Sequence, residues 1–453
     1  MTRTGHASLE SLISAETVVG VVAGRVDSTG LSWCAAAGRS VADTGVIPDK
    51  HTIFRIGSIS KTFTATAVAQ LAARGILDLD DALTRWVPEA GAISDPFGAL
   101  HRITLRHVLT HRSGLPGEAA LRYWANLKFP STDELLASLP RTDLCAPPRS
   151  AFKYSNLGFA LLGIVVERAT GAAFEEWLKA ELLQPLQLDS TGFSPVNADR
   201  TAAGYGGLRT GAGWAAAPVP DHRAFAPAGQ MWSTADDLAR WLAHLLADAR
   251  DRADPVPGAA RRELFRVHDV DATWTSGQAL GWMARRHGEH VTYHHGGAVL
   301  GFQSHVELDL AAGTGAVILT NTMAHAGMET ALSAVRNVTE QTSADLKASA
   351  EVGTSAPGQS AGDVNPFTGR YRWLDAFDAE VHQQQTGLHL YAPLVSGAPR
   401  PEGNRLEPLA AHCRFGVTTG RYMGESIAFD IDDPGNRAQA LELPGGAVLR
   451  RLS

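Results

Sequence analysis

Two residue pairs in the chain have the spacing of a serine nucleophile and a lysine that activates it. Ser58 precedes Lys61 by three positions, and Ser150 precedes Lys153 by the same interval. A serine hydroxyl attacks a carbonyl only when a neighbouring group takes its proton, and a lysine does so when burial or nearby charge lowers its pKa. Two fixed positions recur by chance in 453 residues, so the spacing alone makes neither pair catalytic.

The surroundings of the two pairs separate them. After Ser58, apolar residues recur every four positions and the run ends at Gly75, which predicts an amphipathic helix. Unpaired backbone N–H groups at a helix start favour developing negative charge, and Lys61 would lie one turn further on the same face. The second pair follows two prolines, which prevent the same helical setting. We therefore interpret Ser150 and Lys153 as part of a loop. The apolar residues of the predicted helix are Ile59, Phe63, Ala67 and Leu71.

Two further motifs contain groups that would assist such a serine. Tyr154-Ser155-Asn156 is the only Tyr-x-Asn sequence in the chain. In an extended segment alternate side chains point the same way, so Tyr154 would relay a proton while Asn156 orients a substrate. The sequence His295-Gly296-Gly297 ends a predicted strand, and small residues there would let a substrate backbone lie close.

The elements that must position these motifs predict an α+β fold. A hairpin is expected at 17–26 and 31–37, and strands return at 291–295, 302–308 and 316–320. Helical periodicity dominates between about 100 and 250, at 105–110, 158–170 and 235–246. We expect one antiparallel sheet made from both ends of this region, flanked by helices and interrupted by a helical insertion.

A second unit is predicted at the C-terminus. Residues 343–363 are small and polar, as in an interdomain linker, so the catalytic domain would span 1–342. Short apolar runs separated by Gly, Pro and Asp over 364–453 indicate an all-β unit, either a small barrel or a sandwich.

Charge and composition exclude several partners. The net charge of −7 comes from 40 basic and 47 acidic residues without a basic tract, so we expect no nucleic acid. No segment approaches the ~20 apolar residues of a membrane span, and the N-terminus has no signal-like run, so we expect no membrane partner and a cytoplasmic protein. His107 and His111 have metal-ligand spacing, but Val108 replaces the glutamate of a metalloprotease helix. We expect no metal and no other cofactor.

The three motifs together resemble the serine β-lactamase and penicillin-binding protein superfamily, in particular its class C-like esterase and D-aminopeptidase branch. Ser58 and Lys61 match its S-x-x-K element, Tyr154 and Asn156 its Y-x-N element, and His295 the start of its K-T-G or H-x-G strand. The resemblance covers roughly residues 15–330. It extends to the flanking stretches LDLDDALTRWVPE, ITLRHVLTHRSGLP, YSNLGFALLGIVVERATG and PAGQMWSTADDLARWL.

This resemblance implies an acyl-enzyme mechanism. Ser58 would attack a carbonyl, and Lys61 and Tyr154 would shuttle protons. The backbone N–H groups of Ser58 and Ala298 would hold the oxyanion, with Gly297 beside them and Asn156 on the substrate amide. A histidine replaces the strand lysine, and a neutral imidazole is a poor anchor for a carboxylate, which argues against β-lactam hydrolysis.

The added β unit, expected to be a lipocalin-like barrel, makes the chain similar to a narrower group. These are the penicillin-binding-protein-type thioesterases of nonribosomal peptide biosynthesis, which take a peptidyl thioester from a carrier protein and cyclise it at a D-residue. A D-stereospecific peptidase, amidase or esterase is the alternative, and a β-lactamase or a catalytically inactive binding module is less favoured. Arg450 and Arg451 would contact a substrate carboxylate or carbonyl only if the second unit leans over the catalytic groove.

Overall fold

The structure is a computed structural model. It describes residues 9–15, 18–210, 213–247, 254–323, 331 and 335, and in the C-terminal part 367–373, 377–384, 387–391, 404–409, 413–417, 424–431 and 438–452. The predicted linker at 343–363 lies outside the described residues.

The centre of the catalytic region is an eight-stranded antiparallel sheet in the order β2-β1-β12-β11-β10-β9-β8-β7. The predicted pairing of the N-terminal hairpin with the late strands is confirmed, since Val21 pairs with Thr320 and His305 pairs with Ile318. The strands are β1 (Gly20–Asp27), β2 (Gly30–Gly38), β7 (Asp269–Val270), β8 (Ser276–Gln278), β9 (Met283–His287), β10 (His290–Val299), β11 (Phe302–Asp309) and β12 (Thr314–Thr320).

Helix α2 (Ser60–Ala73) is a core helix, and the prediction that it is amphipathic was wrong. All its residues from 60 to 71 are buried, because it contacts α7 (Asn156–Thr170), α9 (Ala226–Gly229) and α11 (Gly258–Leu264). The buried threonine hydroxyls donate to backbone carbonyls: Thr62 to Ile59 at 2.8 Å, Thr66 to Thr62 at 2.8 Å. The hydroxyl of Thr64 donates to Pro227 of the neighbouring α9 at 2.7 Å. A helix of this kind tolerates burial on every side.

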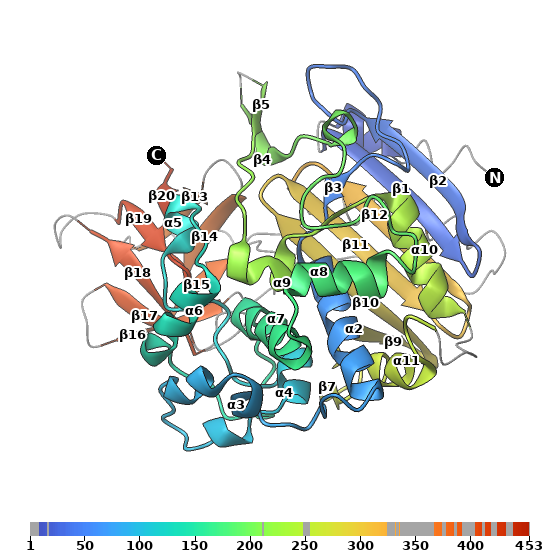
Figure 1. Ribbon diagram of the computed structural model, residues 1–453. Coiled ribbons are helices and arrows are strands. Elements are labelled where there is room, and N and C mark those ends of the chain that lie inside the picture. Colours follow the sequence, from blue (N-terminus) through green and yellow to red (C-terminus); the bar gives the residue numbers. More distant parts are fainter. Residues whose placement is uncertain are drawn as a thin grey trace.

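The helical insertion lies between the sheet and the C-terminal unit (Figure 1). Helix α10 (Ala235–Leu246) packs on β1, β2 and β12. The two-stranded sheets β3-β6 and β4-β5 complete the catalytic region. The remaining elements here are β3 (Phe54–Arg55), η1 (Gly57–Ile59), α3 (Leu83–Trp86), η2 (Pro88–Ala92), η3 (Leu100–Arg102), α4 (Leu105–Leu109), α5 (Tyr123–Asn126), α6 (Thr132–Ser138), η4 (Leu139–Arg141), α8 (Phe174–Leu178), η5 (Lys179–Leu183), η6 (Ala198–Arg200), β4 (Tyr205–Thr210), β5 (Gly213–Ala216), η7 (Arg223–Phe225) and β6 (Trp232–Ser233).

The C-terminal unit is a closed barrel of strands β13 to β20, which decides between the predicted barrel and sandwich. The barrel has its own apolar core, which includes Tyr371, Leu390 and Leu449. It lies beside α5 and α6, at the side of the molecule away from β1 and β2 (Figure 1). The strands are β13 (Gly369–Trp373), β14 (Phe377–Gln384), β15 (Gly387–Tyr391), β16 (Asn404–Pro408), β17 (Arg414–Val417), β18 (Ser426–Asp430), β19 (Ala440–Glu442) and β20 (Val448–Arg451).

Among the described residues, no single helix has the length and apolarity to cross a membrane. Helix α7 and the segment 174–183 meet those criteria only as a pair bent by 76°.

Candidate active site

Ser58 lies in the short turn η1, directly before the buried helix α2. Ser58 is 6% exposed and lines a pocket. Gly57 has a φ of +49°, and a Cβ atom there would lie 2.8 Å from the backbone nitrogen of Ala298. Only glycine fits this conformation and this close approach, which brings η1 against strand β10.

Strand β10 has a free edge where it meets η1. Its pairing with β9 runs from His290 to His294 and no further, whereas its pairing with β11 continues to Val299. A Cβ atom on Gly297 would lie 2.0 Å from the carbonyl oxygen of Ile56, so the two backbones touch. The backbone N–H groups of Ser58 and Ala298, predicted to bind an oxyanion, therefore belong to neighbouring segments.

Lys61 connects the serine to the second motif. Its Nζ atom donates to Ser58 Oγ at 3.2 Å, to Asn156 Oδ1 at 2.8 Å and to the carbonyl of Ala228 at 2.7 Å. The residue is fully buried. A lysine held by three acceptors is fixed in one orientation, and its unprotonated form would accept the serine proton across the 3.2 Å contact.

Tyr154 faces Lys61 and rests on a histidine. The centroid of its ring lies 4.8 Å from Lys61 Nζ and 4.3 Å from the His111 ring. His111 accepts a hydrogen bond from the Ser155 backbone at 3.1 Å through Nδ1. His111 therefore supports the Tyr154-Ser155-Asn156 segment through its ring and through this hydrogen bond. The neighbouring His107 completes a capping box with Thr104.

Asn156 is the first residue of α7, and its amide has two partners. While Oδ1 accepts from Lys61, Nδ2 donates to Glu118 Oε1 at 2.6 Å. The other carboxylate oxygen of Glu118 accepts from the hydroxyl of Tyr123. The pKa of Tyr123 is raised well above its usual value by burial and by the charge of Glu118, so the phenol stays protonated as a donor. Sequence reasoning missed Glu118 and Tyr123, which belong to no motif.

His295 is the histidine that faces the site. Its ring centroid lies 6.4 Å from that of Tyr154, whereas His294 stacks on His305 at 5.7 Å. Burial first, and the charge of Lys61 second, lower the pKa of His295 to about 3. Its Nδ1–H donates to the carbonyl of Gly296 at 2.7 Å. The imidazole of His295 is therefore neutral. This agrees with the expectation from the sequence that His295, unlike a lysine, is a poor anchor for a substrate carboxylate.

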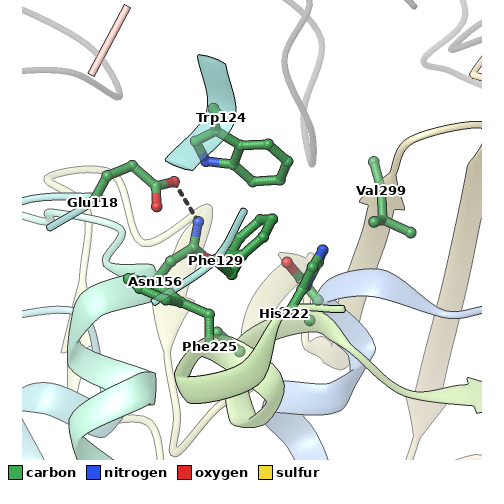
Figure 2. A pocket seen from close by; sticks show the side chains of 11 residues that line it. Glu118, Trp124, Phe129, Asn156, His222, Phe225 and Val299 are labelled. Atoms are coloured by element: carbon green, nitrogen blue, oxygen red, sulfur yellow. Dashed lines mark hydrogen bonds between the residues drawn. The ribbon is translucent and has the colours of Figure 1, made fainter. Parts of the chain in front are cut away.

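The pocket that Ser58 lines has aromatic side chains along one side (Figure 2). The helical insertion supplies one wall, with Trp124, Phe129 and Phe225, and Val299 of β10 stands on the other side. Sequence reasoning missed this wall, because its segments are far apart in the chain and carry no motif. The lining residues are Ser58, Glu118, Trp124, Phe129, Asn156, His222, Phe225, Ala228, Gly229, Ala298 and Val299.

His222 is the unexpected polar group in this wall. Its ring stacks on Phe129 at 4.3 Å, and its Nε2 atom is buried with no hydrogen-bond partner among the described residues. Burial, together with the charges of Arg55 and Lys61, holds its pKa well below the usual value. The pocket therefore contains a neutral imidazole with an unused polar atom.

The structure does not bring Arg450 and Arg451 to the site, so the predicted substrate contact has no support. Arg450 lies exposed on β20. Arg451 lies over the Tyr371 ring at 5.6 Å and donates to the carbonyl of Ala438 at 2.9 Å, inside its own barrel. Neither is among the residues that line the pocket.

With this geometry in place, comparison with known proteins gives the family. The Beta-lactamase family model matches residues 9–340, and the chain belongs to this family. It is 36% identical over 208 residues to Putative beta-lactamase-like 1 of Homo sapiens, which covers 44% of this chain and 40% of the human protein. It is 31% identical over 267 residues to Esterase EstB of Burkholderia gladioli, which covers 50% of this chain and 66% of the esterase. The chain thus spans less than two thirds of either relative.

Two solved structures share the fold. A structure of SurE with D-Leu has a TM-score of 0.61 and 24% identity, and the match covers 99% of this chain and 98% of SurE. A D-stereospecific amidohydrolase from Streptomyces sp. has a TM-score of 0.59 and 23% identity, and covers 73% of this chain and 97% of its own. The family, the fold and the serine hydrolase class agree with the resemblance in the motifs.

Proposed function

We propose that the protein transfers acyl groups through an ester on Ser58, and that the acyl residue is a D-amino acid at the end of a peptide. The donor would be a peptidyl thioester delivered by a peptidyl carrier protein, and the acceptor the amine at the other end of the same peptide. The observation that carries this proposal is the pairing of Ser58, which lines a pocket with aromatic side chains, with the buried Lys61, whose Nζ lies 3.2 Å from the serine hydroxyl.

The residues present supply each step of this reaction. Ser58 Oγ forms the bond to the carbonyl carbon while its proton passes to the unprotonated amine of Lys61. The carbon–sulfur bond then breaks, and the thiolate leaves with a proton relayed from Lys61 by Tyr154. In the second half the substrate amine attacks the ester, gives its proton to the same relay, and Ser58 leaves reprotonated.

Two observations support a peptide donor and an amine acceptor. The likeness to SurE with D-Leu extends over both the catalytic region and the barrel, and D-Leu is a residue of the kind proposed here for the end of the peptide donor. Trp124, Phe129 and Phe225 give the pocket one apolar side, from which an acceptor carried on the peptide itself would displace water.

A D-stereospecific amidase or esterase is the second candidate. The likeness to the D-stereospecific amidohydrolase and to EstB favours it. Glu118 also favours it, because a carboxylate at the pocket wall attracts the free α-ammonium group of a short D-aminoacyl substrate. In this case water, rather than an amine, would release the acyl group from Ser58.

One experiment distinguishes the two. The purified protein is incubated with a linear peptide N-acetylcysteamine thioester ending in D-Leu and with its L-Leu diastereomer, and the products are identified by mass spectrometry. A cyclic peptide from the D-substrate alone supports the first proposal. Only the linear acid, together with cleavage of D-aminoacyl amides, replaces it with the second. A preference for the L-substrate overturns both. In Ser58→Ala neither product should form, and the wild-type protein should label at Ser58 with a fluorophosphonate, whereas an inactive binding module would not.

A further inference from the structure

A turn of the C-terminal barrel reaches into the catalytic region. Glu425, directly before β18, pairs with Lys153, and their side chains are 8% and 0% exposed. The preceding Gly424 has a φ of +80°, and a Cβ atom there would lie 2.8 Å from the carbonyl oxygen of Cys145. This turn is therefore inserted against the catalytic region, and its carboxylate has been taken out of water.

The same carboxylate oxygen has a second partner. Glu425 Oε1 accepts a hydrogen bond from the backbone nitrogen of Gly117 at 3.1 Å. The carbonyl of Gly117 in turn accepts from the backbone nitrogen of Asn156 at 2.8 Å. Glu425 is thus linked to the Tyr-x-Asn motif by two routes. One passes through Gly117 to Asn156, and the other passes through Lys153 to the adjacent Tyr154.

Both routes end at the Tyr-x-Asn motif, one at the backbone of Asn156 and the other at the residue before Tyr154. Asn156 holds Lys61 at 2.8 Å through Oδ1, and the ring of Tyr154 lies 4.8 Å from the same lysine nitrogen. Gly117 also precedes Glu118, which fixes the other end of the Asn156 amide at 2.6 Å. The groups that surround Lys61 on this side are therefore all attached to segments held by Glu425.

We propose that Glu425 is a positioning residue for catalysis, through which the barrel holds Tyr154 and Asn156 against Lys61. The barrel then forms part of the catalytic apparatus, although none of its described residues lines the pocket. Lys153, which the sequence placed in a loop without chemical role, is the counter-charge that makes this connection. The proposal concerns acylation of Ser58 and does not depend on which acyl donor is the natural one.

The interface contains a matched control. Arg122 and Glu442 form a second ion pair between the catalytic region and the barrel, at 3.1 Å, with side chains that are 66% and 34% exposed. This pair crosses the same boundary but lies in solvent, and neither residue contacts the Tyr154 or Asn156 segments in the described hydrogen bonds. Glu442→Gln therefore removes an interdomain charge without touching the catalytic motif.

The test measures how fast a fluorophosphonate labels Ser58 in the full-length protein. In this step the serine oxygen forms a bond to phosphorus, fluoride leaves, and the serine proton passes to the base, so the limiting rate kinact reports the relay while KI reports binding. Glu425→Gln removes the carboxylate that pairs with the buried Lys153 and accepts from the Gly117 backbone, and we expect kinact to fall about tenfold or more with KI nearly unchanged. Glu442→Gln should stay within about twofold of the wild type.

Two further variants keep the result interpretable if Glu425→Gln does not fold. Glu425→Asp keeps the charge but shortens the side chain, and a misplacement of about 1 Å in the relay should also lower kinact by about tenfold. The double variant Glu425→Gln/Lys153→Met removes both charges and also the contact itself, so it should label as slowly as Glu425→Gln. Recovery of the wild-type rate in the double variant would overturn the proposal, because an unbalanced charge rather than lost positioning would then explain the defect. The proposal is overturned if the Asp variant labels at the wild-type rate, or if Glu442→Gln loses as much as the Glu425 variants.

Discussion

The Nζ atom of Lys61 lies over the face of the Tyr154 ring, 4.8 Å from its centroid. The face of this ring therefore packs between the lysine and His111. In the proposed mechanism the hydroxyl of the same residue relays a proton, so packing and proton transfer can be tested separately.

We expect Tyr154→Phe to keep the packing and lose the proton relay. Its turnover should fall by roughly 10²- to 10⁴-fold with little change in the free energy of unfolding. Tyr154→Ala should in addition lose roughly 3–5 kcal/mol of stability, because a buried ring is removed from between Lys61 and His111. Ester turnover and urea unfolding of both variants check this. Wild-type turnover in Tyr154→Phe would show that the hydroxyl plays no part.

The contact between Gly57 and Ala298 predicts that an alanine substitution at Gly57 lowers kcat, whereas the same substitution at Gly75 does not. Gly57 and Gly75 both have a positive φ, of +49° and +70°, but a Cβ atom at Gly75 meets nothing within 4 Å. Gly57→Ala should displace the Ala298 N–H group and lower kcat by roughly 10²- to 10³-fold, as loss of an oxyanion donor does. Gly75→Ala, the control, should reduce stability by about 1 kcal/mol and leave kcat unchanged. Equal kcat in the two variants would show that the Ala298 N–H group does not bind the oxyanion.

The neutral state of His295 predicts a pH dependence of stability. Its pKa is about 3 in the folded protein, below the ordinary value of ~6.5 that it regains on unfolding. Between these values the unfolded chain binds the extra proton, so the contribution of His295 is complete above pH ~6.5 and is lost as the pH falls toward 3. From pH 7 to 5 the loss is about 2 kcal/mol.

Urea unfolding of the wild type and of His295→Gln at pH 7 and pH 5 tests this. The wild type should lose about 2 kcal/mol more than the variant over that interval, since other buried histidines contribute equally to both and cancel. Parallel losses in the two proteins would mean that the imidazole is not held neutral.

The unused Nε2 atom of His222 predicts opposite effects on stability and on binding. In His222→Phe a ring of similar shape still stacks on Phe129, and a buried polar atom without a partner is gone, so stability should rise by about 1 kcal/mol. If a substrate uses this atom, KM for a peptide donor should rise about tenfold while kcat changes less. Thermal unfolding and steady-state kinetics give both values, and an unchanged KM would leave His222 without a binding role.

Much of the fold follows from local patterns. The turn at Ser58, the hairpin of β1 and β2, and the return of strands at β10 to β12 carry strong signals in period and turn residues, and the structure confirms them. Strands β7 to β9 were missed because they are short or polar: β9 reads Met-Ala-Arg-Arg-His, with one buried residue. Helix α2 has an apolar row, but no pattern within it indicates that three other helices cover its remaining faces.

The candidate site also has residues that local patterns predict and residues that they do not. Ser58, Lys61, Tyr154 and Asn156 belong to short motifs, and the structure brings them together, although their roles stay predictions. His222 and Glu425 belong to no motif. Both are far from Ser58 in the chain, so no local sequence pattern indicates that they lie near the site. Their places are set by tertiary packing alone, through the ring of Phe129 for the one and the side chain of Lys153 for the other.

The hydrogen bond from Gly117 to Glu425 joins residues 308 positions apart in the chain. Such a contact forms late, because domains emerge from the ribosome in order and distant segments must find one another. Every motif with a chemical role is synthesised before Glu425. A nascent chain would thus carry its nucleophile, base and tyrosine for some time before the barrel holds them in place, and this delay would keep the serine from reacting until the barrel has been made and has folded.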